Sequence, residues 1–221
     1  WYKGVHRRAW PEGRKYYLAQ LDCLDREVGR IMDQLNELGL DENTLVIYTV
    51  DNGGCVPDWA DNTPLSGSKY HLLEGGTRTP TILSMPGTLP AASTNSSVFS
   101  ALDIGPTICK IAGLPYKDDA FDGQNMFLVL QQNNHAADRD LHWDCGWQWS
   151  VRSGDWKLMV TENEKRAKGS ADFEQVDVRM GVHLYNLADD PIEEYNLAEE
   201  NPEQVQRLRE LHFAWRNSIG Q

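Results

Sequence analysis

The chain has 221 residues and a formal net charge of −12, from 21 lysines and arginines against 33 aspartates and glutamates. With 40% hydrophobic and 24% charged residues, it has the composition of a globular protein with one large domain, or one domain and a small second one. The acidity and the lack of basic runs exclude nucleic acid as a partner, and no apolar run approaches the roughly 20 residues that span a bilayer.

An amphipathic helix and a buried strand are predicted first along the chain. In residues 14–39, apolar side chains recur at every third or fourth position, which predicts a helix that Gly39 ends. Residues 45–50 form a nearly continuous run of strand formers, which predicts a buried parallel strand. A long helix that leads into such a strand is half of a βαβ unit.

Two shorter elements follow this pair. Residues 79–86 predict a second strand. Residues 100–112 predict a short helix with Pro106 in its first turn, ended by Gly113. We therefore expect an α/β domain over residues 1–133.

From residue 134 onward the pattern becomes antiparallel β. The alternation in "WSVRSGDWKLMVT", with a turn at 153–155, predicts a β-hairpin, and "VHLYNLADDP" predicts another strand and turn. Residues 162–178 are rich in Glu, Lys and Asp and predict a mobile loop. A closing amphipathic helix is predicted over 202–219. We expect residues 134–221 to form a small antiparallel subdomain with a terminal helix.

The cysteines, Cys23, Cys55, Cys109 and Cys145, contain no CxxC pair, which argues against a zinc site of the usual spacing. Four cysteines are too few for a disulfide scaffold at this length, so buried free thiols are expected. One glycosylation sequon at Asn95 is a weak indication of a secretory route.

The segment "TVDNGG" carries the first candidate ligands. Asp51 and Asn52 come directly after the predicted strand, where ligands gather in open α/β sheets. Their carboxylate and amide oxygens are hard donors that suit Ca²⁺ or Mg²⁺. Gly53 and Gly54 allow a sharp turn, and the four residues alone are equally typical of an ordinary turn.

The next candidates lie in "LSGSKYHLLEGGTRTP". Lys69 sits among glycine and serine residues and offers a compact positive charge for one oxygen of a small anion, or is a surface lysine. His71 either faces a ligand or lies in solvent. We predict that Glu74 and Arg78 form a pair that braces this loop against the following strand.

These motifs together resemble the sulfatase family of the alkaline-phosphatase-like superfamily. The strand ending in "DNG" is followed by L-x-G-x-K-x-x-L-x-E-G-G-x-R-x-P. The resemblance runs from about residue 14 to the end of the chain. Its other landmarks, in order, are "YYLAQLDCLDREVGRIMDQL", "LDIGPTICKIAGLP", "FDGQNM", "VRSGDWKLM" and "LYNLADDPIEEYNLAEENPE".

The resemblance implies a fold, a reaction and roles for four residues. The fold would be part of a mixed or parallel sheet flanked by helices, followed by the antiparallel subdomain. Asp51 and Asn52 would be calcium (Ca²⁺) ligands, with Mg²⁺ possible, and Lys69 would be the catalytic, sulfate-binding lysine with His71 beside it in substrate binding. The substrate would be a sulfate ester of a small molecule or glycan. Family members work in the periplasm, in lysosomes or outside the cell.

The chain departs from the family pattern in one decisive respect. The family's nucleophile is a formylglycine made from a Cys-x-Pro-Ser-Arg segment that lies well before the DNG motif, together with an Asp-Asp calcium pair, and neither is present before residue 51. Cys55 begins a C-x-P sequence but lies after the motif and lacks the Ser-Arg, so we reject it as nucleophile. Ser66, Tyr70 and His71 also replace the family's usual residues. We expect the C-terminal portion of a sulfatase, inactive on its own.

Two alternatives stay open. The parent protein could be a phosphodiesterase or phosphomutase of the same superfamily, with a Thr or Ser nucleophile and two metals. The chain could also be a non-catalytic module that binds sulfated glycans through Lys69 and tryptophans that stack on sugars, namely Trp143, Trp147 and Trp149. Nothing in the sequence indicates an oligomeric state.

Overall fold

A computed structural model describes residues 12–117, 119–162 and 179–220, which form two compact units. The first, here the sheet unit, comprises Trp1–Glu27, Thr49–Pro80 and Arg139–Gln221. The second, here the helix unit, comprises Val28–Tyr48 and Thr81–Asp138. The loop with the candidate ligands thus belongs to the same unit as the C-terminal sheet. The division of domains at residue 133 stays a prediction.

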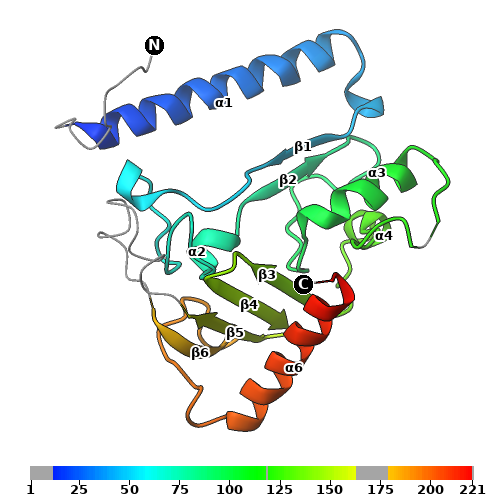
Figure 1. The fold of residues 1–221 in the computed structure, drawn as a ribbon. Coiled ribbons are helices and arrows are strands. Elements are labelled where there is room, and N and C mark those ends of the chain that lie inside the picture. The colour runs from blue at the N-terminus through cyan, green and yellow to red at the C-terminus, as the bar shows by residue number, and fades with distance from the viewer. Residues whose placement is uncertain (1–11, 118, 163–178, 221) are drawn as a thin grey trace. The chain divides into compact units, whose positions relative to one another are not determined.

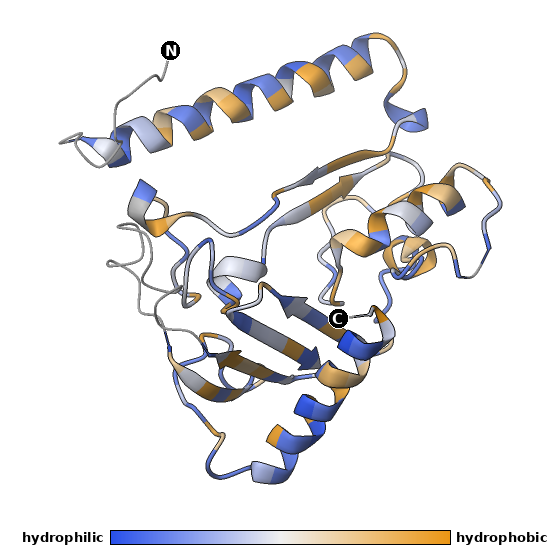
Figure 2. Ribbon diagram, viewed as in Figure 1, coloured by the Kyte–Doolittle hydropathy of each residue, from blue (hydrophilic) through white to orange (hydrophobic). Residues whose placement is uncertain are grey.

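The predicted first helix is confirmed as α1 (Gly13–Glu37). Gly39 follows it with φ +66°, a left-handed conformation that glycine adopts at low cost and that ends a helix. Hydrophobic and hydrophilic residues alternate along α1 (Figure 2), and Leu21, Leu24 and Ile31 of its apolar face are exposed. In the part of the chain that the structure describes, no helix is long and apolar enough to cross a membrane.

The two short strands of the first half pair with each other. After the 3-10 turn η2 (Asp41–Asn43), β1 (Val46–Thr49) pairs with β2 (Thr81–Ser84) in a two-stranded sheet. Figure 1 shows that they run in opposite directions. The expectation of a buried parallel strand at 45–50 is therefore wrong, since β1 is only half-buried and no parallel sheet occurs among the described residues.

The reason for the antiparallel pairing lies at the base of the loop between these strands. The amide of Gly53 donates to the carbonyl oxygen of Gly76 across 2.9 Å, and the Thr49 hydroxyl donates to the Pro80 carbonyl across 3.4 Å. The loop contains η3 (Val56–Asp58) and the single-turn helix α2 (Glu74–Thr77). The chain thus returns to the sheet at the end of β1 from which it departed, as in a hairpin. A parallel partner would need a crossover that carries the chain back to the start of β1.

The helix unit ends in η4 (Ala101–Asp103), α3 (Ile104–Ile111) and α4 (Phe127–Gln131). The first two confirm the helix predicted over 100–112, and α4 was not predicted. Two buried polar side chains hold the segment before α4. Asp103 accepts hydrogen bonds from the amides of Ser100 (2.7 Å) and Gln124 (2.8 Å). The hydroxyl of Thr107 accepts from the amide of Met126 across 2.9 Å. The Asp-x-x-x-Thr spacing therefore serves to cap and anchor backbone groups.

The C-terminal sheet has four antiparallel strands in the order β3 (Asp140–Asp144), β4 (Gln148–Ser153), β5 (Trp156–Thr161) and β6 (Gly181–Asn186). The predicted hairpin is confirmed by the pairing of β4 with β5. The closing helix is confirmed as α6 (Pro202–Ser218). The mobile loop predicted over 162–178 lies, apart from Glu162, outside the described residues.

Both faces of this sheet are buried. Side chains alternate across a strand, so neighbours on β5 point to opposite faces. Leu158 and Val160 pack in the core beneath α6, together with Leu208 of that helix. Met159 packs on the other face with Leu73, which precedes α2. The sheet therefore supports α6 on one face and the candidate loop on the other.

Candidate functional site

The two segments with predicted ligands lie against each other in the sheet unit. The backbone amide of Lys69 donates to the carbonyl oxygen of Gly54 across 3.1 Å. Asn62 ties the same segments with its side chain, because Nδ2 donates to the carbonyl oxygens of Gly54 (2.8 Å) and Gly67 (3.1 Å). The segment that follows Asp51 and Asn52 is thereby fixed against the loop that carries Lys69.

Glycines are required where these backbones meet. A Cβ atom on Gly53 would lie 1.8 Å from the carbonyl oxygen of Gly75, and one on Gly76 would lie 2.1 Å from that of His71. Neither backbone atom can move aside as a flexible side chain would. The glycines of "DNGG" and "EGG" therefore serve close packing of the loop on itself.

Sequence reasoning missed Asn62 and Ser68. The hydroxyl of Ser68 is buried, accepts the amide of Val56 at 3.0 Å and lies 3.3 Å from the carbonyl oxygen of Gly54. Both residues bind backbone groups that are distant along the chain. A pattern of residue types contains no signal for such partners, since any backbone amide or carbonyl can fill the role.

Asp51 is exposed and Asn52 is half-buried. The Nδ2 atom of Asn52 donates to the carbonyl oxygen of Gly53 across 2.8 Å, so its amide oxygen is the atom suited to a cation. Two hard oxygen donors fit Ca²⁺ chemically but supply only part of the six to eight ligands it takes. Within residues 12–117, 119–162 and 179–220, no group of three or more His, Cys, Asp or Glu could hold a metal ion.

Lys69 is half-buried, and its ammonium lies 5.2 Å from the ring centroid of Tyr70. Tyr70 has φ +78°, a left-handed conformation that costs about 1 kcal/mol or more in residues other than glycine. Tyr70 is one of the positions at which the chain departs from the sulfatase pattern, and its backbone is strained.

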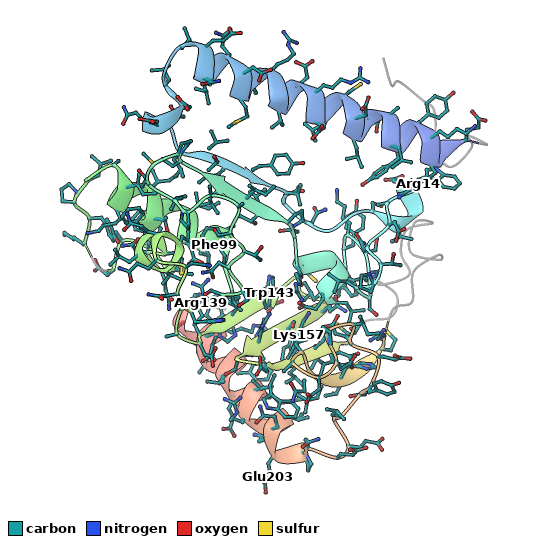
Figure 3. All side chains as sticks on the ribbon, turned by 180° about the vertical axis from the view of Figure 1, so that it is seen from behind. Arg14, Phe99, Arg139, Trp143, Lys157 and Glu203 are labelled. Atoms are coloured by element: carbon teal, nitrogen blue, oxygen red, sulfur yellow. The ribbon has the colours of Figure 1, made fainter. Side chains whose placement is uncertain are left out.

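His71 is buried, with 3% of its surface exposed, so the alternative of a histidine in solvent is wrong. Its ring meets that of Trp147 edge-on, with centroids 6.4 Å apart. Trp147 lies between β3 and β4 and is half-buried. Trp149, by contrast, is 3% exposed in the core beneath α6 and cannot stack on a ligand. Trp143, on β3 (Figure 3), is half-buried.

The brace predicted between Glu74 and Arg78 has a different partner in the structure. Glu74 is buried, and its carboxylate lies 2.8 Å from the ammonium of Lys157 on β5, whereas Arg78 is exposed. Glu74 does support the loop, as expected, but against the C-terminal sheet. The sequence analysis did not identify Lys157. The signal was its position in β5, since residues 157 and 159 point to the same face of the strand and Met159 is apolar, which places the lysine on a buried face.

The structure describes all four cysteines of the chain. All four are free, but Cys23 and Cys145 are exposed, so the expectation of burial is wrong for these two. Burial raises the pKa of the Cys55 thiol, and the side chain and charge of Asp58 raise it further, opposed by the backbone of Asp58 and the charge of Lys69. A thiol that resists deprotonation is a poor nucleophile.

Comparisons with known proteins agree on one family. A model described as Sulfatase matches residues 5–114. The chain is 31% identical over 202 residues to a sulfatase of Formosa agariphila, covering 85% of this chain and 36% of that protein. It is 30% identical over 226 residues to human arylsulfatase A, covering 91% of this chain and 43% of the relative. An N-acetylgalactosamine-6-O-sulfatase of Bacteroides thetaiotaomicron is 28% identical over 202 residues, which is 85% of this chain and 39% of that protein.

Solved structures give the same result. The crystal structure of Ps i-CgsB in complex with k-i-k-neocarrahexaose superposes with a TM-score of 0.76 at 26% identity, over 92% of this chain and 43% of that one. A structure from Bacteroides thetaiotaomicron, a sulfatase of glycosaminoglycan metabolism, gives a TM-score of 0.71 at 27% identity, over 85% and 42%. The chain spans about two fifths of the length of the relatives it matches.

Proposed function

The chain belongs to the sulfatase family of the alkaline phosphatase superfamily, and we propose that it supplies part of the cation and sulfate site for the hydrolysis of a sulfated sugar. In this proposal Asp51 and Asn52 hold Ca²⁺, and Lys69 binds the sulfate group. His71, which is buried, contributes to substrate binding by supporting the ring of Trp147. The proposal concerns the whole protein, of which these residues are one part.

The observation that carries the proposal is the bond between Lys69 and Gly54. It fixes the lysine backbone to the segment that begins with Asp51 and Asn52. A hard cation and an ammonium held on one loop can both neutralise the oxygens of a sulfate ester. When bound, the cation would supply Lewis-acid stabilisation of the negative charge. The ammonium of Lys69 needs no proton transfer to act in the same way.

The activities for which relatives are named support a sugar as substrate. One relative is an N-acetylgalactosamine-6-O-sulfatase, and the structural relative Ps i-CgsB was crystallised with an oligosaccharide. The half-buried ring of Trp147 beside His71 offers an apolar surface of the kind that stacks on sugar rings. We therefore propose a sulfated glycan rather than a simple aryl ester.

The 221 residues contain no Cys-x-Pro-Ser-Arg segment from which the family's nucleophile is made. We propose that this chain alone binds a sulfated glycan but does not hydrolyse it, because loss of a nucleophile costs several orders of magnitude in rate. The alternative of a non-catalytic glycan-binding protein predicts the same behaviour for the chain. The two differ only when the whole protein is assayed.

Calorimetric titration tests the proposal. The chain is titrated with a sulfated oligosaccharide and with its desulfated form, each with Ca²⁺ and with a chelator. We expect binding of the sulfated form in Ca²⁺, at least tenfold weaker binding in chelator, and no release of sulfate on incubation. Equal affinity for both oligosaccharides would contradict a sulfate site.

A further inference from the structure

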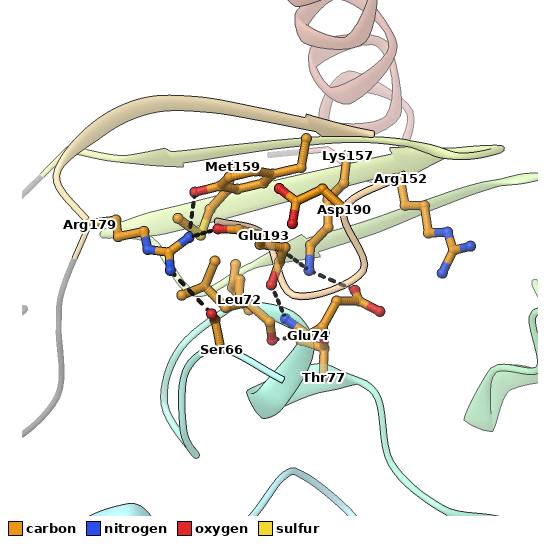
Figure 4. A network of polar contacts seen from close by, with 12 residues as sticks. Ser66, Leu72, Glu74, Thr77, Arg152, Lys157, Met159, Arg179, Asp190 and Glu193 are labelled. Carbon is orange, nitrogen blue, oxygen red and sulfur yellow. Dashed lines mark hydrogen bonds and ion pairs between the residues drawn. The ribbon is translucent and has the colours of Figure 1, made fainter. Parts of the chain in front are cut away.

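A buried cluster of three charged side chains joins the candidate loop to the C-terminal sheet (Figure 4). The ammonium of Lys157 lies 2.8 Å from the carboxylate of Glu74 and 2.9 Å from that of Glu193. The other carboxylate oxygen of Glu193 accepts the backbone amide of Glu74 across 2.6 Å. Each member of this cluster therefore contacts the other two.

The cluster is withdrawn from water. Lys157 and Glu193 have no exposed surface, and Glu74 is 4% exposed. Burying a charge is costly unless an opposite charge and hydrogen bonds compensate for the lost water, so the three groups depend on one another. A cluster of this kind contributes little to the free energy of unfolding, since replacing it with apolar side chains of similar size is often neutral or stabilising. Its three-way geometry suits a role in fixing the position of a segment.

The segment so fixed is the loop of residues 66–77. Its anchor at Glu74 is joined by two others on the same side of the sheet. The side-chain oxygen of Gln148, on β4, accepts the amide of Leu72 across 2.9 Å. Arg179 donates to the hydroxyl of Ser66 across 3.2 Å and also to the hydroxyl of Tyr185 on β6 across 2.9 Å. Lys69 and His71 lie between these anchors along the chain.

Glu193 is itself held in an unusual backbone conformation. Its φ of +59° is left-handed, and the amide of Glu193 donates to the carbonyl oxygen of Asp190 across 3.1 Å. The carbonyl oxygen of Glu193 accepts a bond from Arg179. Burial raises the pKa of the Glu193 carboxyl, and the neighbouring ammonium of Lys157 opposes that rise. A strained residue that the surrounding bonds hold in place is a mark of a functional constraint.

We propose that Lys157, acting through Glu74 and Glu193, is the positioning residue of the ligand-binding loop. This inference rests on the proposed function for its ligand and on the observed contacts for its mechanism. Without the ammonium, two buried carboxylates face each other and one must take up a proton or move away. Protonation or displacement of Glu193 weakens the bond that it accepts from the Glu74 amide, and this loosens the loop at its Glu74 anchor.

Hydrogen exchange of backbone amides tests the mechanism in the 221-residue chain. We compare Lys157→Met with the matched control Leu158→Ala, which alters the adjacent residue on β5 but on the face beneath α6. The measured quantity is the exchange ratio, which is the exchange rate of the Leu72 and Glu74 amides divided by that of the β4 amides. We expect Lys157→Met to raise the exchange ratio at least tenfold and Leu158→Ala to leave it unchanged. Equal exchange ratios in the two variants would overturn the inference.

Two further variants guard against loss of folding. Glu193→Gln keeps the shape of the side chain and removes one charge, so it should accelerate the same amides in the same direction. Lys157→Arg keeps the positive charge and should restore slow exchange, at least in part. If Glu193→Gln folds and leaves the loop amides protected as in the original chain, the inference is wrong.

A titration with inorganic sulfate separates this inference from the proposed function. Binding is followed at the Lys69 amide by nuclear magnetic resonance. We expect Lys157→Met to weaken sulfate binding about tenfold and Leu158→Ala to leave it unchanged. If the original chain binds no sulfate, the proposed function fails, while the exchange ratio still decides the positioning role. If it binds sulfate equally well with Lys157→Met, the positioning role fails alone.

Discussion

The amide of Lys69 donates to the carbonyl oxygen of Gly54 across 3.1 Å, and this bond joins the predicted anion-binding lysine to the predicted cation ligands two and three residues before the glycine. The two groups are separated by 17 or 18 positions in sequence, yet one backbone contact relates them. A short, rigid connection of this kind is what a site for a sulfate ester and a cation requires, because the relative position of lysine and cation decides how the negative charge of the sulfate group is neutralised.

Asp51→Ala should weaken Ca²⁺ binding by roughly tenfold or more, because a carboxylate is the stronger of the two proposed ligands. The matched control is Asp25→Ala, which removes another exposed carboxylate, from α1. Calorimetric titration with Ca²⁺ measures the effect. Identical affinities for the two variants would remove Asp51 from the proposed site.

Gly76→Ala should lower the free energy of unfolding by at least about 2 kcal/mol, because the new Cβ meets a backbone oxygen. That oxygen, of His71, would lie 2.1 Å away. Gly29→Ala, in α1, has nothing within 4 Å of the new Cβ and should be neutral or stabilising by about 0.5–1 kcal/mol. Urea unfolding of both variants makes the comparison, and a neutral Gly76→Ala would refute the close packing of this loop.

Tyr70→Gly should raise the free energy of unfolding by about 1 kcal/mol, because glycine adopts the left-handed conformation without strain. The φ of Tyr70 is +78°. Tyr195→Gly, at a tyrosine that is 65% exposed, should instead destabilise by a few tenths to about 1 kcal/mol, because it only adds freedom to the unfolded chain. Thermal and urea unfolding measure the stability of both variants. An equal loss of stability in the two variants would contradict the claim that the backbone of Tyr70 is strained.

Stability should fall as the pH falls from about 6.5 to about 4, owing to His212 of α6. Burial lowers the pKa of His212 to about 4, helped by His142 and Arg216 and opposed by Asp144. The ring also stacks on that of Trp149, with centroids 4.3 Å apart. The unfolded chain therefore binds a proton at higher pH than the folded chain does.

The contribution of His212 to the free energy of unfolding is complete above pH 6.5 and is lost as the pH falls towards 4. Its upper limit is about 3 kcal/mol. His142, whose pKa burial also lowers, acts in the same direction. The free energy of unfolding is measured across this range for the original chain and for His212→Gln. The variant should show a shallower dependence, and parallel curves would refute the assignment.

The elements with strong local patterns were predicted correctly. The periodicity of α1, the alternation of β4 and β5 and the proline at the start of α6 are all properties of neighbouring residues, and local geometry follows from them. The parallel pairing expected of the strand at residues 45–50 was wrong, because β1 pairs with the antiparallel strand β2. The direction of β2 depends on the bond between Gly53 and Gly76, whose donor and acceptor are backbone groups with no sequence signature.

The candidate ligands could be chosen from the sequence, but their supports could not. Asp51, Asn52 and Lys69 stood out by residue type and by family resemblance, and their roles stay predictions. The ion pair of Glu74 was assigned to Arg78, four residues away, whereas the structure pairs it with Lys157, 83 residues away. A lysine in a strand is ordinarily exposed, and only the packing of the loop on the sheet explains its burial.

The sulfate site is tested most directly by Lys69→Ala, measured as the affinity of the chain for a sulfated oligosaccharide in Ca²⁺. Lys15→Ala, which removes a lysine with a 75% exposed side chain, is the control. The account predicts at least a tenfold loss of affinity for Lys69→Ala and none for Lys15→Ala, with the stability of both variants within about 0.5 kcal/mol of the original chain. Unchanged affinity in a folded Lys69→Ala variant would contradict the account.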